Sequence, residues 1–138
     1  MKLGIFLPLF YVVMLSAQES AVMVRDAWVQ LPLPSKTETA VYLVIENHSA
    51  QKRALVAAVS EAARKLELHQ MRMDGRIMVM TPVSAITIPA HGKASLSPSG
   101  FHMMMYGLKT RPNVGDKVDI TLMLDDGTSI PVTAVVKK

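Results

Sequence analysis

Two pairs of histidine and methionine are the side chains in this sequence best suited to chemistry. Ten residues separate His69 from Met80, and one residue separates His102 from Met104. The chain has 11 Met against 3 Phe, 3 Tyr and 1 Trp, and it has no cysteine. Without thiolates, a site for a soft metal ion must use thioether and imidazole donors. Most of the methionines fall in one stretch: Met71, Met73, Met78, Met80, Met103, Met104 and Met105.

A hairpin is predicted around Asp74-Gly75, because Asp-Gly between two apolar segments favours a tight turn with positive φ. With these two residues as the whole loop, His69 lies opposite Met80, their Cβ atoms about 4.5–5.5 Å apart. Side chains alternate between the two faces of a strand. One face then carries His69, Met71, Met73, Met78 and Met80. The other face is the predicted core face and carries Leu66, Leu68, Ile77 and Val79.

The second pair lies in the segment FHMMMY, residues 101–106. Alternation places His102 and Met104 on one face of a strand and Phe101, Met103 and Met105 on the other. Methionine is also an ordinary filler of hydrophobic cores. Two His–Met pairs that each share a face nevertheless favour a metal site over filler.

The donor types indicate copper(I). Thioethers are soft, neutral ligands that favour Cu(I), whereas Mg²⁺ and Ca²⁺ require oxygen ligands. Thioethers cannot form disulfides, so they suit an oxidising compartment. Because imidazole binds a metal only when neutral, we expect the affinity for Cu(I) to fall below about pH 6.5. The remaining histidines, His48 and His91, lie in turn-like segments and are predicted to be surface residues.

The spacing His-x10-Met-x21-His-x-Met, from His69 to Met104, resembles that of the PCuAC family of periplasmic copper chaperones. Neighbouring segments resemble the family too, including residues 26–29 (DAWV) and 98–102 (PSGFH). The resemblance implies a cupredoxin-like β-sandwich without a blue-copper centre. It also implies delivery of copper to the CuA centre of cytochrome c oxidase subunit II, in company with Sco-type thiol proteins. The Cu(I) ligands that it implies are His69, Met80, His102 and Met104.

The elements that must position these residues are predicted to be strands, since alternation of period two recurs after residue 20 and no sustained helical period does. Turn residues separate them at the spacing of an all-β sandwich of the immunoglobulin-like kind, in one domain. The segment 54–60 fits a buried strand or a helical turn equally well. Apart from that undecided segment, the predicted strands are 21–30, 39–46, 65–73, 76–83, 85–88, 94–96, 102–108, 117–124 and 129–136.

The first residues have the pattern of a secretory signal peptide. Lys2 precedes an apolar run over residues 3–15, and Ser16-Ala17 follows it. The run is shorter than the ~20 residues of a membrane-spanning helix. We expect a signal peptide over 1–17, a copper-binding domain over 18–138 and a periplasmic location. Because no cysteine follows the signal, a lipid anchor is not expected.

Alternative functions remain open on the sequence. The same ligands would serve a periplasmic copper sequestration or resistance protein. Without a metal, the methionine face would be the partner surface of an immunoglobulin-like adhesion or assembly module. An enzyme is not expected, because no Gly-x-Ser-x-Gly element or similar frame is present. The net charge is +4, but the basic clusters have no interleaved aromatic residues, so nucleic-acid binding is not expected either. Met71, Met73 and Met78 could shield the ion or act as transfer ligands.

Overall fold

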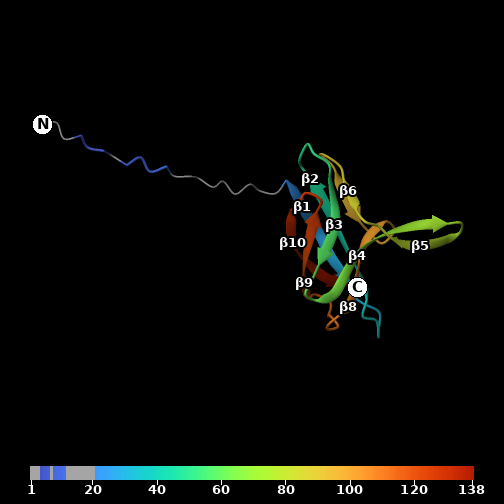
Figure 1. The fold of residues 1–138 in the computed structure, drawn as a ribbon. Coiled ribbons are helices and arrows are strands. Elements are labelled where there is room, and N and C mark those ends of the chain that lie inside the picture. Colours follow the sequence, from blue (N-terminus) through green and yellow to red (C-terminus); the bar gives the residue numbers. More distant parts are fainter. Residues whose placement is uncertain (1–3, 7, 12–20) are drawn as a thin grey trace.

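The computed structural model describes residues 4–6, 8–11 and 21–138, and the described residues form ten strands and no helix (Figure 1). Residues 4–6 and 8–11 have no secondary structure, and the predicted cleavage point after Ala17 lies outside the described residues. The strands are β1 (Val22–Gln30), β2 (Thr39–Asn47), β3 (Arg53–Val59), β4 (Ala63–Asp74), β5 (Ile77–Pro82), β6 (Ile86–Ile88), β7 (Lys93–Leu96), β8 (Phe101–Leu108), β9 (Lys117–Leu124) and β10 (Ser129–Lys137). The all-β prediction is confirmed, and the ambiguous segment 54–60 is a strand.

All ten strands belong to one continuous sheet in the order β5-β4-β8-β7-β2-β1-β10-β9-β3-β6. β2 joins the two halves, because it pairs with β8 and β7 on one side and with β1 on the other. The sheet folds back on itself, so that β3 and β4 are in contact although they are far apart in the strand order. This closure gives an inner face around one core and an outer face.

The core takes alternate residues from each strand, as the period-two pattern predicts. Met103 and Met105 of β8 are fully buried in it, which confirms the face assigned to them. Other fully buried side chains come from both halves of the sheet: Val29, Val41, Leu43, Ile45, Leu55, Ile86, Ile88, Ile120, Leu122 and Val136.

A bulge in β1 changes which residues face outward. The register with β2 shifts between Arg25 and Trp28, and Asp26 has a φ of 55°. Val24 before the bulge and Val29 after it both contact the core, although they are five positions apart and a regular strand would put them on opposite faces. The extra residue therefore turns Trp28 to the outer face, where its ring lies 4.8 Å from that of Tyr42.

The turn between β4 and β5 is formed by Gly75 and Arg76, so the predicted loop of Asp74 and Gly75 is wrong by one residue. Asp74 pairs with Ile77, and only the first turn residue, Gly75, has a positive φ, as in a type II′ turn. The predicted pairing of His69 with Met80 is wrong as well: in the observed register, Met80 lies opposite Met71 and His69 lies opposite Pro82. The register shift is an even number of residues, so each side chain stays on its predicted face.

The outer half of the β4–β5 hairpin projects from the body of the molecule (Figure 1). Pairing between β4 and β8 ends at Gln70 and Phe101. The predicted core face of the hairpin is therefore right for Leu68, which is buried, but wrong for Ile77, which is 68% exposed. Beyond Gln70 none of the other described strands pairs with the hairpin.

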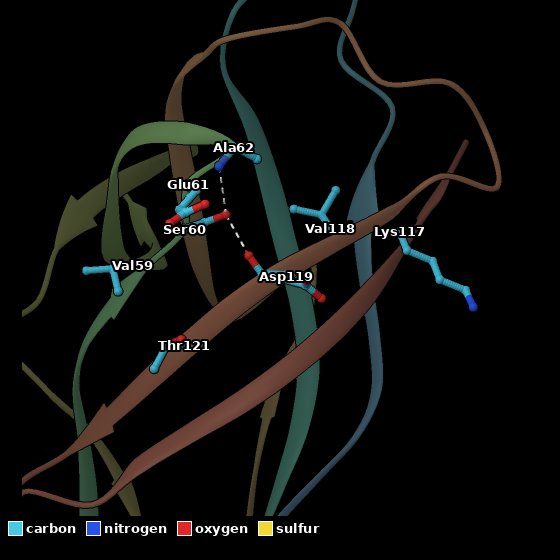
Figure 2. A pocket seen from close by; sticks show the side chains of 8 residues that line it. All are labelled: Val59, Ser60, Glu61, Ala62, Lys117, Val118, Asp119 and Thr121. Atoms are coloured by element: carbon cyan, nitrogen blue, oxygen red, sulfur yellow. Dashed lines mark hydrogen bonds between the residues drawn. The ribbon is translucent and has the colours of Figure 1, made fainter.

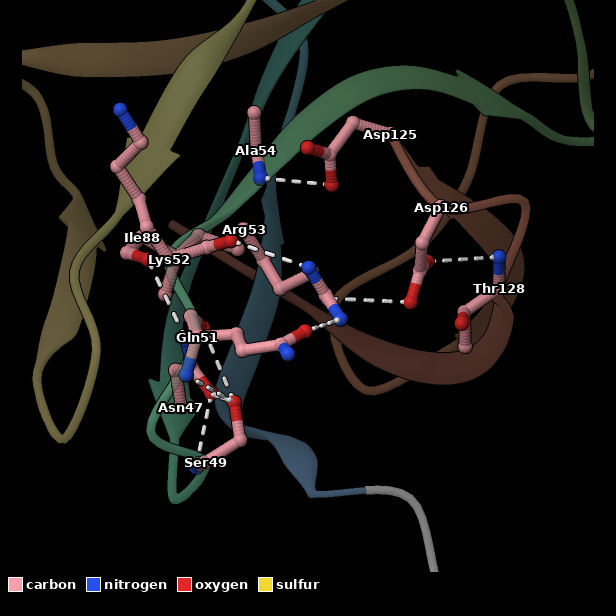
Figure 3. Close-up of polar contacts among 10 residues, drawn as sticks. All are labelled: Asn47, Ser49, Gln51, Lys52, Arg53, Ala54, Ile88, Asp125, Asp126 and Thr128. Atoms are coloured by element: carbon pink, nitrogen blue, oxygen red, sulfur yellow. Dashed lines mark hydrogen bonds and ion pairs between the residues drawn. The ribbon is translucent and has the colours of Figure 1, made fainter.

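Polar contacts tie together the turns at the end of β2 that is remote from Thr39 (Figure 3). The Asn47 side chain donates to the carbonyl of Gln51. Arg53 forms an ion pair with Asp126 at 3.1 Å, and the amide of Ala54 donates to Asp125. This network joins the β2–β3 and β9–β10 turns with amide, guanidinium and carboxylate groups, and its contacts include no thioether or imidazole.

Candidate metal centre

The two predicted His–Met pairs come together on the outer face of the sheet. β4 and β8 are antiparallel, and their register places His69 directly opposite His102. The two imidazole centroids are 5.7 Å apart. Both histidines are buried, at 6% and 3% exposure, yet neither belongs to the hydrophobic core cluster. Their burial thus comes from neighbours on the outer face rather than from the core.

Met80 reaches this pair from β5. Its Sδ lies 2.9 Å from Nε2 of His102. The other ring nitrogen, Nδ1, donates to the carbonyl oxygen of Gly100 at 3.3 Å. In that tautomer Nε2 carries a lone pair that faces the thioether sulfur. An imidazole nitrogen and a soft sulfur donor thus face each other at one point.

A cavity of about 290 Å³ is lined by most of the expected ligand residues. Met80, His102 and Met104 line it, together with Met71. Part of its wall consists of Ala40, Tyr42 and Pro98 and residues of the β1–β2 loop. His69 does not line this cavity, although its ring adjoins that of His102. Three of the four expected ligands therefore share one cavity with an additional methionine.

His69 is held by a carboxylate that the sequence reasoning missed. Its Nε2 lies 3.0 Å from Oε2 of Glu67, and its Nδ1 is buried without a hydrogen-bond partner among the described residues. An unpaired buried nitrogen costs about 1–3 kcal/mol, so such a group usually has a ligand or a strained role. The pKa of Glu67 is held below its usual value, first by the hydrogen bond from His69 and then by that from Lys65. The sequence held one signal for this contact: alternation along β4 places residues 67 and 69 on the same face.

Burial keeps His102 neutral. Desolvation lowers the pKa of its imidazole below the ordinary 6.5, with a partial opposing effect from the hydrogen bond to Gly100. The neutral ring is the form that binds a metal ion. The other histidines lie on the surface as predicted: the His48 side chain is 59% exposed beside Glu46, and His91 is exposed.

Two tyrosine rings adjoin the imidazoles, a tryptophan packs behind one of them, and the sequence analysis gave none of these rings a role. Tyr42 lies 6.4 Å from His102, and Tyr106 lies 6.3 Å from His69, measured between ring centroids. Trp28 packs against Tyr42 from the neighbouring strand. The rings restrict the orientation of the imidazoles and reduce their contact with water.

The donor set is soft and neutral. Within the part of the chain that the structure describes, no three side chains of His, Cys, Asp or Glu gather as a metal site. The groups that do gather are two imidazoles and the thioethers of Met71, Met80 and Met104. Such donors suit Cu(I) better than a hard cation.

A larger hollow, of about 650 Å³, lies elsewhere, between the β3–β4 turn and β9 (Figure 2). The hydroxyl group of Ser60, which lines the hollow, donates to the carbonyl oxygen of Asp119 and accepts from the amide of Ala62. No histidine lines the hollow to act as a base for Ser60. The Ser60 hydroxyl therefore connects the β3–β4 turn to β9.

Comparison with known sequences identifies a matching family and a relative. The protein family described as "Putative lipoprotein LpqE-like" matches residues 22–136. The chain is 33% identical over 121 residues to "Putative lipoprotein Lxx21020" of Leifsonia xyli subsp. xyli, which covers 87% of this chain and 72% of that protein. The match confirms no site residue. Among the described residues, no helical segment is long and apolar enough to cross a membrane.

Solved structures share the architecture. The copper-bound PCuAC domain from PmoF2 has a TM-score of 0.73 at 19% identity, over 86% of this chain and 93% of that domain. The solution structure of Cu(I)-DR1885 from Deinococcus radiodurans has a TM-score of 0.68 at 34% identity, over 91% of this chain and 82% of that one. The predicted cupredoxin-like fold is thereby confirmed.

Proposed function

The chain belongs to the LpqE-like family of putative lipoproteins, and from that premise we propose that it is an exported, Cu(I)-binding chaperone. The observation that supports this most is the approach of His102 Nε2 to Met80 Sδ at 2.9 Å, in a cavity that Met104 also lines. A relative in structure that is 34% identical, DR1885, is described with Cu(I) bound.

The proposed ligands are His69, Met80, His102 and Met104. His102 would bind through Nε2, since its Nδ1 is occupied by the Gly100 carbonyl. His69 would bind through Nδ1, the buried nitrogen without a partner, while Glu67 accepts the hydrogen on Nε2. A carboxylate that orients a metal-binding imidazole in this way is a common arrangement around metal ions.

The position of the site favours transfer. Pairing of β4 with β8 holds the two buried imidazoles opposite each other, whereas Met80 lies on the projecting hairpin (Figure 1) and is 50% exposed. An incoming ligand could replace the Met80 thioether first, while the buried imidazoles still hold the ion. Neutral ligands leave the bound ion its positive charge, which a thiolate-bearing acceptor would attract. We propose the CuA centre of cytochrome c oxidase subunit II as the acceptor, Sco-type thiol proteins as co-workers and the periplasm as the location.

An anaerobic Cu(I) titration against a chelator tests binding. We expect one tight equivalent for the parent protein and weaker binding for His69→Ala, Met80→Leu, His102→Ala and Met104→Leu. A parent protein that takes up no stoichiometric Cu(I) refutes the proposal. Deleting the gene separates delivery from sequestration: loss of oxidase activity when copper is scarce indicates delivery, whereas sensitivity to abundant copper indicates sequestration.

A further inference from the structure

The β4–β5 hairpin extends the methionine face beyond the cavity. The observed register places Met71 opposite Met80, and then Met73 opposite Met78 one step nearer the turn. Only the first of these pairs lines the cavity. The second pair lies on the same face because both positions are two residues further along their strands.

The outer pair is open to solvent on a projecting arm. Met73 is 58% exposed and Met78 is 46% exposed, and the arm extends past the last pairing of β4 with β8 (Figure 1). Neither methionine belongs to the hydrophobic core cluster or to the residues packed against it. Packing in the described domain therefore does not explain why methionines occupy these two positions.

The geometry of the outer pair suits a two-thioether site. Residues directly opposite each other on antiparallel strands have Cβ atoms about 4.5–5.5 Å apart, and each sulfur is two bonds further along a flexible side chain. Two sulfurs at that separation can turn toward one ion. The charged neighbours Arg72 and Asp74 alternate onto the opposite face of the arm, so Arg72 does not lie between the sulfurs. Arg76 belongs to the turn, outside the paired positions.

The step from the outer pair to the inner pair is short. Two residues along a strand span about 6.6–6.8 Å, and diagonal neighbours across a strand pair are about 7–8 Å apart. An ion held by Met73 and Met78 is therefore within reach of the Met80 side chain. Met80 in turn contacts His102.

We propose that Met73 and Met78 form a second, weaker site for a soft monovalent cation, through which Cu(I) enters and leaves the cavity. The inference rests on the proposed function, because it gives the outer pair the same cargo. Two neutral thioethers without an imidazole bind less tightly than the inner set, which suits a site that loads and releases quickly. No redox step is involved, since the ion keeps its charge throughout.

Silver(I) is the probe for this second site, because it is soft, monovalent and stable in air. The experiment titrates Ag(I) into the full protein while the methyl resonances of the methionines are followed by NMR. We expect the first equivalent to shift Met80 and Met104 and the second to shift Met73 and Met78. The double variant Met73→Leu/Met78→Leu should lose the second equivalent and keep the first, and it should load Cu(I) from a chelator more slowly in stopped-flow measurements.

The control is Met23→Leu, which removes a thioether of equal exposure, 58%, from β1, outside the arm. It should behave as the parent protein does. If the methyl groups of Met73 and Met78 do not shift with excess Ag(I), or if the double variant loads as fast as the parent, the inference is wrong. If the first equivalent also fails to bind, the proposed function itself fails, so the two failures are distinguishable. Both variants replace exposed side chains, and an amide NMR spectrum checks that they fold.

Discussion

Replacing Met80 by leucine isolates the contribution of its thioether. The sulfur lies 2.9 Å from His102 Nε2, and the side chain is 50% exposed. Leucine has a similar volume and no donor atom, and such exchanges usually cost less than about 1.5 kcal/mol even in a core. Since half of this side chain is already in water, we expect the free energy of unfolding of the metal-free protein to fall by less than about 1 kcal/mol.

The effect on Cu(I) binding should be much larger. Losing a residue that only orients a metal ligand typically lowers metal affinity about 10- to 100-fold. Met80 would be a direct ligand, so we expect at least that loss, equivalent to about 1.4–2.8 kcal/mol of binding free energy. The assay is an anaerobic competition titration against a Cu(I) chelator, together with urea unfolding of the metal-free protein.

Met23→Leu is the matched control, because it removes an exposed thioether from a strand that contributes no expected ligand. Its Cu(I) affinity should equal that of the parent. If Met80→Leu binds Cu(I) as tightly as the parent does, Met80 is not a ligand and the reasoning from its contact with His102 is refuted. If Met80→Leu instead unfolds at a much lower urea concentration, the side chain is structural.

Three further predictions concern two residues of the site, Glu67 and His102, and one glycine at the end of β8. Glu67→Gln weakens the acceptor for His69 Nε2 and should lower Cu(I) affinity about tenfold with little change in unfolding; an unchanged titration would make the contact incidental. Burial lowers the pKa of His102 below 6.5, so the folded, metal-free protein favours the neutral imidazole. The free energy of unfolding should therefore be highest above pH 6.5 and should decrease as the pH falls through the folded-state pKa. Urea unfolding from pH 7.5 to 5 should show this decrease, and the variant His102→Gln should not. Gly107→Ala should cost about 1–3 kcal/mol, since φ is 68° and the new Cβ would lie 2.8 Å from that of Arg64, whereas Gly127→Ala, with positive φ but open space, should cost less.

The face of the strand on which each side chain lies could be predicted from the sequence, because alternation is a local property of a strand. His102 and Met104 lie outside the core while Met103 and Met105 lie inside it, as predicted. Assignments of this kind need only the pleat of one strand and no knowledge of its partners.

The position of the β4–β5 turn was harder to predict from the sequence. Gly75 can occupy the second place in an Asp-Gly type I′ turn or the first place in a type II′ turn, and both satisfy its positive φ. The choice moves the register by two residues and decides whether His69 or Met71 lies opposite Met80. The local sequence does not separate the two, since either register leaves every side chain on the same face.

The sequence by itself determined the kind of chemistry: no thiolates, two imidazoles and several thioethers on shared strand faces, in an all-β chain. The tertiary structure decided which of these donors meet. Pairing of β4 with β8 sets His69 against His102, and the β1 bulge turns Trp28 onto Tyr42 beside them. The physical reason is that donor type and alternation belong to single residues and strands, whereas register between strands distant in sequence depends on the hydrogen bonds and packing of the whole sheet.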